Sequence, residues 1–129
     1  MIRIYREQEQ NKDFYALMGR FFASKEIAKE MDQQIYNTAG TDWYIATHRG
    51  YVQGFVSVTK RNKYGFLDNL WIVPEWRGKG IGTELVETVL DDNPGVIRCI
   101  ACNPYAIRIL EKYGFDEVGK NGRYKRFEH

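Results

Sequence analysis

This chain has little of what marks membrane, disulfide-rich or disordered proteins. No apolar run approaches the roughly 20 residues that a membrane-spanning helix needs, and residues 1–6 lack the apolar core of a signal peptide. Only two of the 129 residues are cysteine and only three are proline. The formal net charge of +2 is too small to indicate nucleic acid by itself. We therefore expect a cytoplasmic protein without a membrane partner, and the net charge does not favour nucleic acid as a partner.

The two cysteines, Cys99 and Cys102, form a Cys-x-x-Cys sequence that could be mistaken for a metal or redox site. They lie in an apolar segment, 96–102, that is typical of a buried strand. Side chains of a strand alternate between its faces, so an offset of three points the two sulfurs in opposite directions. His48 and His129 are isolated and supply no second pair of ligands. We predict two structural thiols and no metal site.

The remaining composition is that of a globular domain. Hydrophobic residues make up 43% of the chain and charged residues 28%, with both signs intermixed, which excludes a disordered polymer. A chain of this length fits one domain with one core. We therefore expect residues 1–129 to form a single domain.

Hydrophobic spacing predicts an alternation of strands and helices. Ser24 can cap the second helix, which carries Ile27 and Ile35 and should end at 38–40. The predicted order is βααβββαβαββ, a mixed α/β sheet with helices on both faces. The elements are a strand at 2–6, a helix around 14–22, a helix from Ser24, strands at 43–47, 51–59 and 66–73, a helix at 80–90, a strand at 97–102, a helix at 105–112 and a hairpin through Asn121 and Gly122.

The segment 77–82, Arg-Gly-Lys-Gly-Ile-Gly, carries the most specific information in the chain. It follows an apolar run and precedes an amphipathic one, so we predict a strand, a glycine-rich loop and the first turn of a helix. Such a turn leaves backbone N–H groups unpaired at the positive end of the helix dipole, which favours an anion. The glycines let the backbone approach a phosphate closely, and Arg77 and Lys79 add positive charge. The loop therefore predicts a phosphorylated ligand.

The spacing of the glycines narrows the class of loop. A P-loop requires Gly-Lys followed by Ser or Thr, but Lys79 is followed by Gly80. A dinucleotide-binding loop requires a third glycine where this chain has Thr83. What remains is Arg-x-x-Gly-x-Gly at Arg77, Gly80 and Gly82. This pattern resembles the pyrophosphate-binding loop of the GNAT superfamily of acyl-CoA-dependent N-acetyltransferases.

Two further segments are similar to the same superfamily. Residues 70–77 are similar to the strand and turn that lead into this loop, and 103–115 resemble an Asn-x-x-Ala helix that closes on Gly-Phe. The resemblance implies acetyl-CoA as co-substrate, a primary amine as acceptor and no metal, and it allows a homodimer. It also implies that strands 66–73 and 97–102 part at their carboxyl ends to admit the pantetheine arm of acetyl-CoA. By resemblance, the cofactor-binding residues are Leu70, Trp71, Ile72, Val73, Arg77, Gly78, Lys79, Gly80, Ile81, Gly82, Thr83 and Asn103.

These residues are expected to bind in different ways. The backbone of 70–73 should pair with the arm, whereas the four side chains should pack in the core. The amide of Asn103 can bond to the arm or to a bound water, or the residue can simply begin the helix that follows it.

The implied reaction needs a base, because an amine must lose a proton before it attacks a thioester. Asp68 stands where relatives carry a strand-borne base, and the alternation of side chains predicts that it shares the face of Leu70 and Ile72. The alternative for Asp68 is a solvated strand residue. Many relatives carry a tyrosine acid where this chain has Leu110. Tyr113, one turn further on, can substitute only if its helix end turns toward the sulfur, and the alternative is packing.

Three functions remain open from the sequence. The leading one is an N-acetyltransferase that moves an acetyl group from acetyl-CoA to a primary amine. Leu110 and the lack of a certain base leave open a CoA-binding module without catalysis. Basic clusters at 60–64 and 123–126 leave open a small interaction domain for RNA or an acidic partner, although solvated turns also explain such clusters. The acceptor should be set by the loop 20–24 and the C-terminal hairpin.

Overall fold

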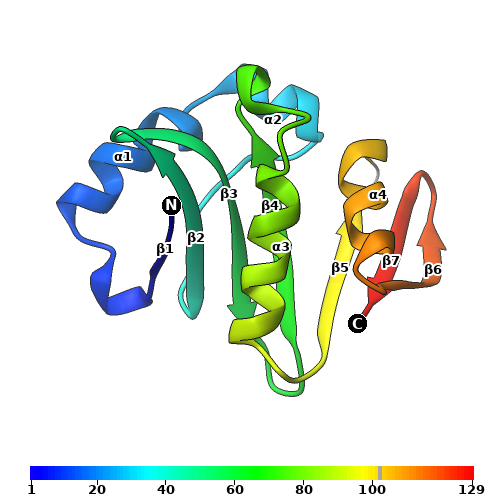
Figure 1. Cartoon of the computed structure of the whole chain (residues 1–129). Helices are drawn as coiled ribbons and strands as arrows, with labels where there is room; N and C mark the ends of the chain where they lie inside the picture. The colour runs from blue at the N-terminus through cyan, green and yellow to red at the C-terminus, as the bar shows by residue number, and fades with distance from the viewer. Residues whose placement is uncertain (102) are drawn as a thin grey trace.

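The computed structural model describes residues 1–101 and 103–129, which form one seven-stranded sheet with four α-helices (Figure 1). The strands lie in the order β1-β2-β3-β4-β5-β7-β6, and only β4 and β5 run parallel to each other. The chain order βααβββαβαββ is the predicted one. The elements are β1 (Ile2–Tyr5), α1 (Lys12–Phe22), α2 (Lys25–Met31), β2 (Thr41–His48), β3 (Tyr51–Lys60), β4 (Gly65–Ile72), α3 (Ile81–Asp92), β5 (Ile97–Ala101), α4 (Pro104–Lys112), β6 (Asp116–Asn121) and β7 (Tyr124–Glu128), with short 3₁₀ turns at Glu7–Glu9 and Pro74–Trp76.

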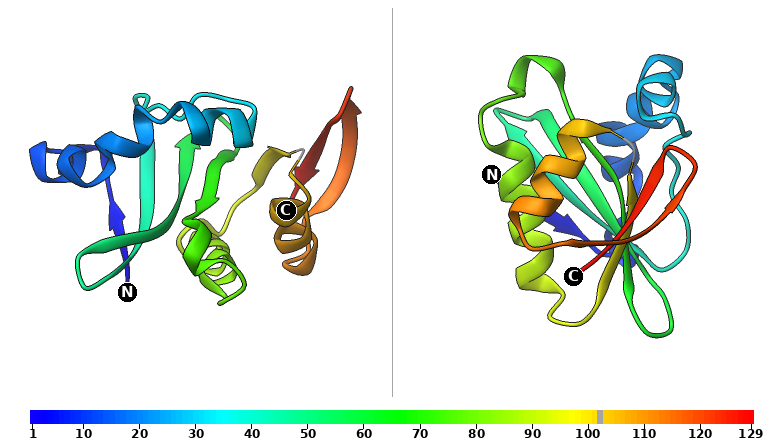
Figure 2. Two further views of the ribbon diagram at one scale, coloured as in Figure 1. Left: turned by 90° about the horizontal axis from the view of Figure 1, so that it is seen from above. Right: turned by 90° about the vertical axis from the view of Figure 1, so that its right-hand side faces the viewer.

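Helices lie on both faces of the sheet, as predicted (Figure 2). On one face, α1 and α2 pack on an aromatic cluster in which Phe14, Trp43 and Phe55 are fully buried. On the other face, α3 and α4 contribute residues such as Leu85 and Leu110 to a mainly aliphatic core. Within the described residues, the aromatic cluster takes no member from β5, β6 or β7. The first pair of helices therefore covers only the half of the sheet that ends at β4.

Helix α2 ends earlier than its apolar spacing predicts. Ser24 caps its start, where Oγ accepts a hydrogen bond from the N–H of Ile27 at 3.2 Å. Its C-cap is Asp32, whose φ of 58° is left-handed. Such a residue commonly ends a helix because the next N–H turns back, here from Gln33 to the carbonyl of Ala28 at 3.0 Å. The prediction that this helix runs to 38–40 was wrong.

Strands β4 and β5 pair over only three residues. Residues 65–67 of β4 lie opposite 97–99 of β5. Beyond Leu67 the described parts of the two strands are unpaired with each other, while β4 stays paired with β3 as far as Ile72. The strands part toward their carboxyl ends, as the resemblance implied. The backbone of 68–72 is therefore open on the side that faces β5.

A β-bulge in β4 overturns the predicted face of Asp68. Asn69 has a φ of 57°, and the register of β3 against β4 shifts opposite it. The extra residue reverses the alternation of side chains. Leu67 and Ile72 therefore both belong to the α3–α4 core, with Leu70 packed against it. Asp68 lies on the opposite face from Leu70 and Ile72, toward α1 and α2, and the prediction of a shared face was wrong.

The predicted Cys-x-x-Cys thiols are described only in part. Cys99 is a free, buried thiol within the α3–α4 core, and burial raises its pKa. Cys102, for which the opposite face was predicted, lies outside the described residues.

Candidate active site

The parting of β4 and β5 opens a groove between the two faces of the sheet, here called the β4–β5 groove. Its walls come from β4, β5, α4, β7 and the end of α2. The groove is lined by Met31, Gln33, Leu67, Asp68, Asn69, Leu70, Cys99, Ile100, Ala101, Asn103, Ala106, Leu110 and Tyr124. The structure thus brings together the predicted base, one predicted position of the cofactor strand, and the predicted amide of Asn103.

Asp68 is held at the groove by two hydrogen bonds to one of its oxygens. Oδ1 accepts from the backbone N–H of Asn69 at 2.8 Å and from Nε2 of Gln33 at 2.8 Å. In the part of the chain that the structure describes, Oδ2 has no hydrogen-bond partner. One oxygen is therefore fixed by the protein, and the other is left to accept a proton.

The bulge that orients Asp68 is itself anchored by buried polar side chains. Nδ2 of Asn69 donates to Oγ of Ser57 at 2.9 Å, and that hydroxyl donates to the carbonyl of Asp68 at 3.2 Å. Ser57 is fully buried and Asn69 nearly so. A left-handed residue other than glycine costs about 1–2 kcal/mol, which these two hydrogen bonds offset.

The glycine-rich loop presents unpaired N–H groups at the start of α3. The first hydrogen bond of the helix runs from the N–H of Glu84 to the carbonyl of Gly80. Among the described residues, the N–H groups of 78–83 have no protein acceptor before that point. Gly78 and Gly80 have φ of 77° and 85°, and a Cβ built at either position would meet only open space. These features fit a pyrophosphate that approaches the backbone from solvent.

Arg77 binds protein groups rather than extending freely from the loop. Its Nε donates to the carbonyl of Ile72 at 2.9 Å, and Nη2 lies 2.6 Å from Oε1 of Glu30 on α2. The guanidinium also lies over the ring of Trp71, 5.5 Å from its centroid. Arg77 therefore ties the end of β4 to α2. The nearest free positive charge in the loop is Lys79, which is exposed beside the ring of Trp76.

The predicted cofactor residues on either side of the loop are mostly buried. Trp71 and Val73 pack toward α1 and α2, and Ile72 and Ile81 pack toward α3 and α4. These side chains are core residues, as expected for positions that would bind through their backbone. Thr83 lies half-buried in the first turn of α3.

Gly82 lies in close contact with α4. A Cβ at this position would lie 2.7 Å from Cδ1 of Ile109 and 3.0 Å from the hydroxyl of Tyr105, both on α4. A larger residue would require the side chains of Ile109 and Tyr105 to move, so glycine lets α3 and α4 pack closely beside the loop.

Asn103 both begins α4 and lines the groove. Its Oδ1 accepts a hydrogen bond from the N–H of Tyr105 at 2.8 Å, which is an N-cap contact. Its Nδ2 has no protein partner among the described residues. Capping and ligand binding are therefore compatible in one side chain, because they use different atoms.

The two positions considered for the acid lie in different places. Leu110 is fully buried and lines the β4–β5 groove. Tyr113 lies at the other end of α4 from Asn103, outside the groove lining, and its hydroxyl donates to Oε2 of Glu87 on α3 at 3.0 Å. Burial and the neighbouring Glu87 carboxylate raise the pKa of Tyr113. The structure does not bring Tyr113 to the other candidate residues.

Two polar residues that line the groove, Gln33 and Asn69, were missed by sequence reasoning, and both contact Asp68. Their only sequence signal is their proximity to predicted turns, because their pairing depends on the bulge and on the early end of α2. The C-terminal hairpin, which was expected to help set the acceptor, reaches the end of α2 through Arg123 and Tyr124, which both bind the carboxylate of Asp32. The described residues contain no group of three or more His, Cys, Asp or Glu side chains arranged to hold a metal, and none of the described helices is long and apolar enough to span a membrane.

Comparison with known proteins agrees with this geometry. The profile of the acetyltransferase (GNAT) family matches residues 5–115, whereas no curated protein is significantly similar in sequence. The fold is shared with an acyl-CoA N-acyltransferase from Pseudomonas aeruginosa (TM-score 0.81, 14% identity, 100% of this chain and 98% of that chain covered). It is also shared with ElaA of Escherichia coli (TM-score 0.81, 12% identity, 100% of this chain and 99% of that chain covered). A third similar structure is the ribosomal-protein-S18-alanine N-acetyltransferase of E. coli (TM-score 0.64, 18% identity, 99% of this chain and 91% of that chain covered).

Proposed function

This chain belongs to the GNAT acetyltransferase family, and from that premise we propose that it transfers an acetyl group from acetyl-CoA to a primary amine. One observation carries the proposal: the edge of β4 that β5 leaves unpaired leads, through the turn Pro74–Trp76, to a helix start whose N–H groups are unpaired among the described residues. A pyrophosphate and an extended arm attached to it would use both features at once. When bound, acetyl-CoA supplies an acyl thioester.

The backbone of the chain would hold the co-substrate at two places. The N–H groups of 78–83 would bind the pyrophosphate, with Lys79 adding positive charge. Strand β5 leaves the backbone edge of 68–72 unpaired. This edge would form hydrogen bonds with the amides of the arm. Asn103 would add its free amide group from the start of α4. This division explains why the side chains of 71–73 can be given over to packing.

Asp68 would accept the proton of the amine. A primary amine is mostly protonated near neutral pH and cannot attack until the proton leaves. The free Oδ2 of Asp68 can take that proton directly or through water, while Gln33 and the bulge hold Oδ1 in place. The bulge also turns the carboxylate toward α1 and α2, and the loop 20–24 that was expected to set the acceptor lies on that same side.

Leu110 leaves the departing thiolate without a hydroxyl at the position where many relatives carry one. The same fact favours the second candidate, a CoA-binding module without catalysis. Water can protonate a thiolate of CoA, so we expect a slower enzyme and not an inactive one.

Release of free thiol separates the two candidates. Acetyl-CoA is mixed with the protein and with a panel of amines, aminoglycosides and peptides, and thiol is measured together with acetyl-CoA binding by calorimetry. Acetyl-CoA binding with amine-dependent thiol release supports the transferase. Binding without release from any amine supports the binding module. Absence of acetyl-CoA binding would contradict both.

A further inference from the structure

One face of the sheet formed by β5, β7 and β6 is covered by no described helix. Helix α4 packs on the opposite face, and the cluster under α1 and α2 stops at β4. In Figures 1 and 2 these three strands extend away from α1 and α2 toward the C-terminal end of the sheet. Ile100 of β5 and Val118 of β6 are 42% and 55% exposed. Apolar side chains on an open sheet face indicate a surface that another molecule can cover.

A hollow on this face continues the β4–β5 groove. We call this surface the β5–β7 face. The hollow is lined by Tyr64, Phe66, Arg98, Ile100, Val118, Arg126 and Glu128, together with Cys99 of β5 and Phe127 of β7. Strand pairing places these residues together, because Phe66 lies opposite Arg98, and Ile100 lies opposite Arg126. Ile100 lines both this hollow and the β4–β5 groove. A molecule bound on the β5–β7 face would thus reach the groove that contains Asp68.

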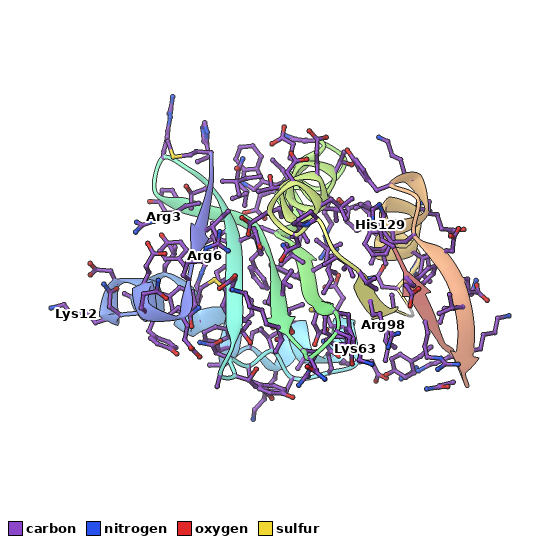
Figure 3. All side chains as sticks on the ribbon, turned by 90° about the horizontal axis from the view of Figure 1, so that it is seen from below. Arg3, Arg6, Lys12, Lys63, Arg98 and His129 are labelled. Carbon is purple, nitrogen blue, oxygen red and sulfur yellow. The ribbon has the colours of Figure 1, made fainter. Side chains whose placement is uncertain are left out.

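Positive charge surrounds the apolar floor. Arg61 and Lys63 lie in the turn before β4, and Figure 3 shows Lys63 and Arg98 near each other at this end of the sheet. Arg98 is paired with Glu128 at 3.0 Å, whereas Arg61, Lys63 and Arg126 form no ion pair among the described residues. The carboxylates on the face are Glu128, which Arg98 neutralises, and Asp116 at the outer edge. The excess of positive charge favours an anionic partner.

We propose that the β5–β7 face binds an acidic segment of a polypeptide acceptor and so delivers an amine of that polypeptide to the β4–β5 groove. This inference rests on the proposed transferase function. An extended peptide presents alternate side chains to one side. It can place apolar side chains on Ile100 and Val118 while its carboxylates meet the arginines.

Two other occupants fit the face less well. Proteins that bind single-stranded nucleic acid stack bases on free aromatic rings, but here the guanidinium of Arg98 lies 4.5 Å from the centroid of Tyr64 and that of Arg61 lies 5.9 Å from the centroid of Phe66. A second copy joined by a two-fold axis would place this face against itself. Its arginines would then oppose arginines, which is unfavourable.

Arg126 offers two independent ways to test the charge. Its guanidinium lies beside Gly119 of β6, where a Cβ would come within 2.7 Å of Cζ. Arg126→Glu reverses the charge, and Gly119→Ala displaces the guanidinium while the net charge stays the same. Both residues lie outside the candidate active site, and Arg126 is exposed, so folding should be preserved.

The test is the binding of a fluorescently labelled peptide, in which glutamate alternates with valine, to the full chain without acetyl-CoA. We expect binding that weakens as salt is raised, an affinity about tenfold lower in Arg126→Glu, and a smaller loss in Gly119→Ala. Lys12→Glu, the same charge reversal on α1 at the far end of the molecule (Figure 3), should bind as the parent does.

The proposal is overturned if the peptide fails to bind, if Lys12→Glu weakens binding as much as Arg126→Glu, or if oligouridine RNA binds more tightly than the peptide. It is also overturned if light scattering shows a dimer that Arg126→Glu dissociates. Because this assay contains no acetyl-CoA, its failure is independent of the failure of the transferase proposal. An enzyme that acetylates small amines without binding the peptide would refute only the present inference.

Discussion

At the scale of single residues, the candidate site depends on which oxygen of Asp68 is engaged. We expect Asp68→Asn to lower turnover by about two to four orders of magnitude and to leave the affinity for acetyl-CoA unchanged. The deficit should shrink at high pH, where the amine loses its proton unaided. Steady-state rates across a pH series, with calorimetry for acetyl-CoA, measure both effects.

Asp91→Asn is the control for Asp68→Asn, because Asp91 is exposed at the far end of α3. Unaltered turnover in Asp68→Asn near neutral pH would show that Asp68 is a solvated strand residue and not the base.

Tyr113 makes a contact between helices, so its hydroxyl should be dispensable for thiol release. Tyr113→Phe removes the hydrogen bond to Glu87 and keeps the ring. We expect unchanged turnover and a small loss of stability, below about 1 kcal/mol, because the bond is exposed. A large loss of turnover in a stable variant that still binds acetyl-CoA would make Tyr113 the acid.

Gly54 of β3 allows the close approach of β4 along the cofactor strand. A Cβ at this position would lie 2.9 Å from the carbonyl oxygen of Trp71 and 2.6 Å from Cδ1 of Ile72. We expect Gly54→Ala to lower the free energy of unfolding by about 1–3 kcal/mol in urea titrations. Gly19→Ala, in α1 with nothing within 4 Å, should raise it by roughly 0.5–1 kcal/mol. Equal effects of the two changes would contradict this account.

At the scale of elements, an ion cluster fastens the end of α3 to the sheet. Arg6 donates to both oxygens of Asp92 at 2.7 Å and to Asp42 at 2.7 Å, and the hydroxyl of Tyr44 donates to Asp92 at 2.6 Å. The bonds from Arg6, and less strongly the one from Tyr44, hold the pKa of Asp92 below its usual range. A carboxylate with a lowered pKa stabilises the folded chain above its unfolded pKa of about 4, and this stability is lost as pH falls through the folded pKa.

Asp92→Asn should therefore be less stable than the parent at pH 7, by roughly 2 kcal/mol for the lost charged hydrogen bonds. The difference should narrow as the pH falls below about 4, because Asp92 of the parent becomes protonated there. Urea unfolding of both proteins at neutral and acid pH measures the two gaps. A gap that stays constant with pH would show that Asp92 contributes through its shape alone.

The order of elements could be predicted from the sequence because each has a clear hydrophobic period and clear turn residues. The spacing of the glycines likewise predicted a loop that leads into a helix start, since unpaired N–H groups at a helix start are a local property of the chain. The face of Asp68 could not be predicted, because the bulge at Asn69 depends on a buried bond to Ser57 on another strand. Nor could the partners of Arg77, which joins Glu30 only after α2 folds over β4.

At the scale of the whole molecule, ligand binding should raise the free energy of unfolding. A ligand that binds only the folded state at about 100 times its Kd adds about 2.7 kcal/mol, which for a chain of this size raises Tm by roughly 10 °C. We expect acetyl-CoA to do so in thermal unfolding, and we expect Gly80→Val to abolish the shift by blocking the approach of phosphate to the loop.

Gly50→Val is the matched control for Gly80→Val. Gly50 has a φ of 82°, close to the 85° of Gly80, and also faces open space, but it lies in the β2–β3 turn. Both variants should lose similar stability, while only Gly50→Val should keep the shift with acetyl-CoA. Retention of the full shift in Gly80→Val would show that the loop assignment is wrong.

For the proposed transferase, the short pairing between β4 and β5 also places activity and stability in opposition. Each further hydrogen bond between the two strands would stabilise the fold by about 0.5–1.5 kcal/mol, and each would close part of the groove. Substitutions that extend the pairing of β4 and β5 should thus be enriched when variants are selected for thermal stability alone. They should be lost when variants are selected for both stability and catalysis. In the proposed transferase, the unpaired edge of 68–72 would thus be available to the co-substrate at a cost in stability.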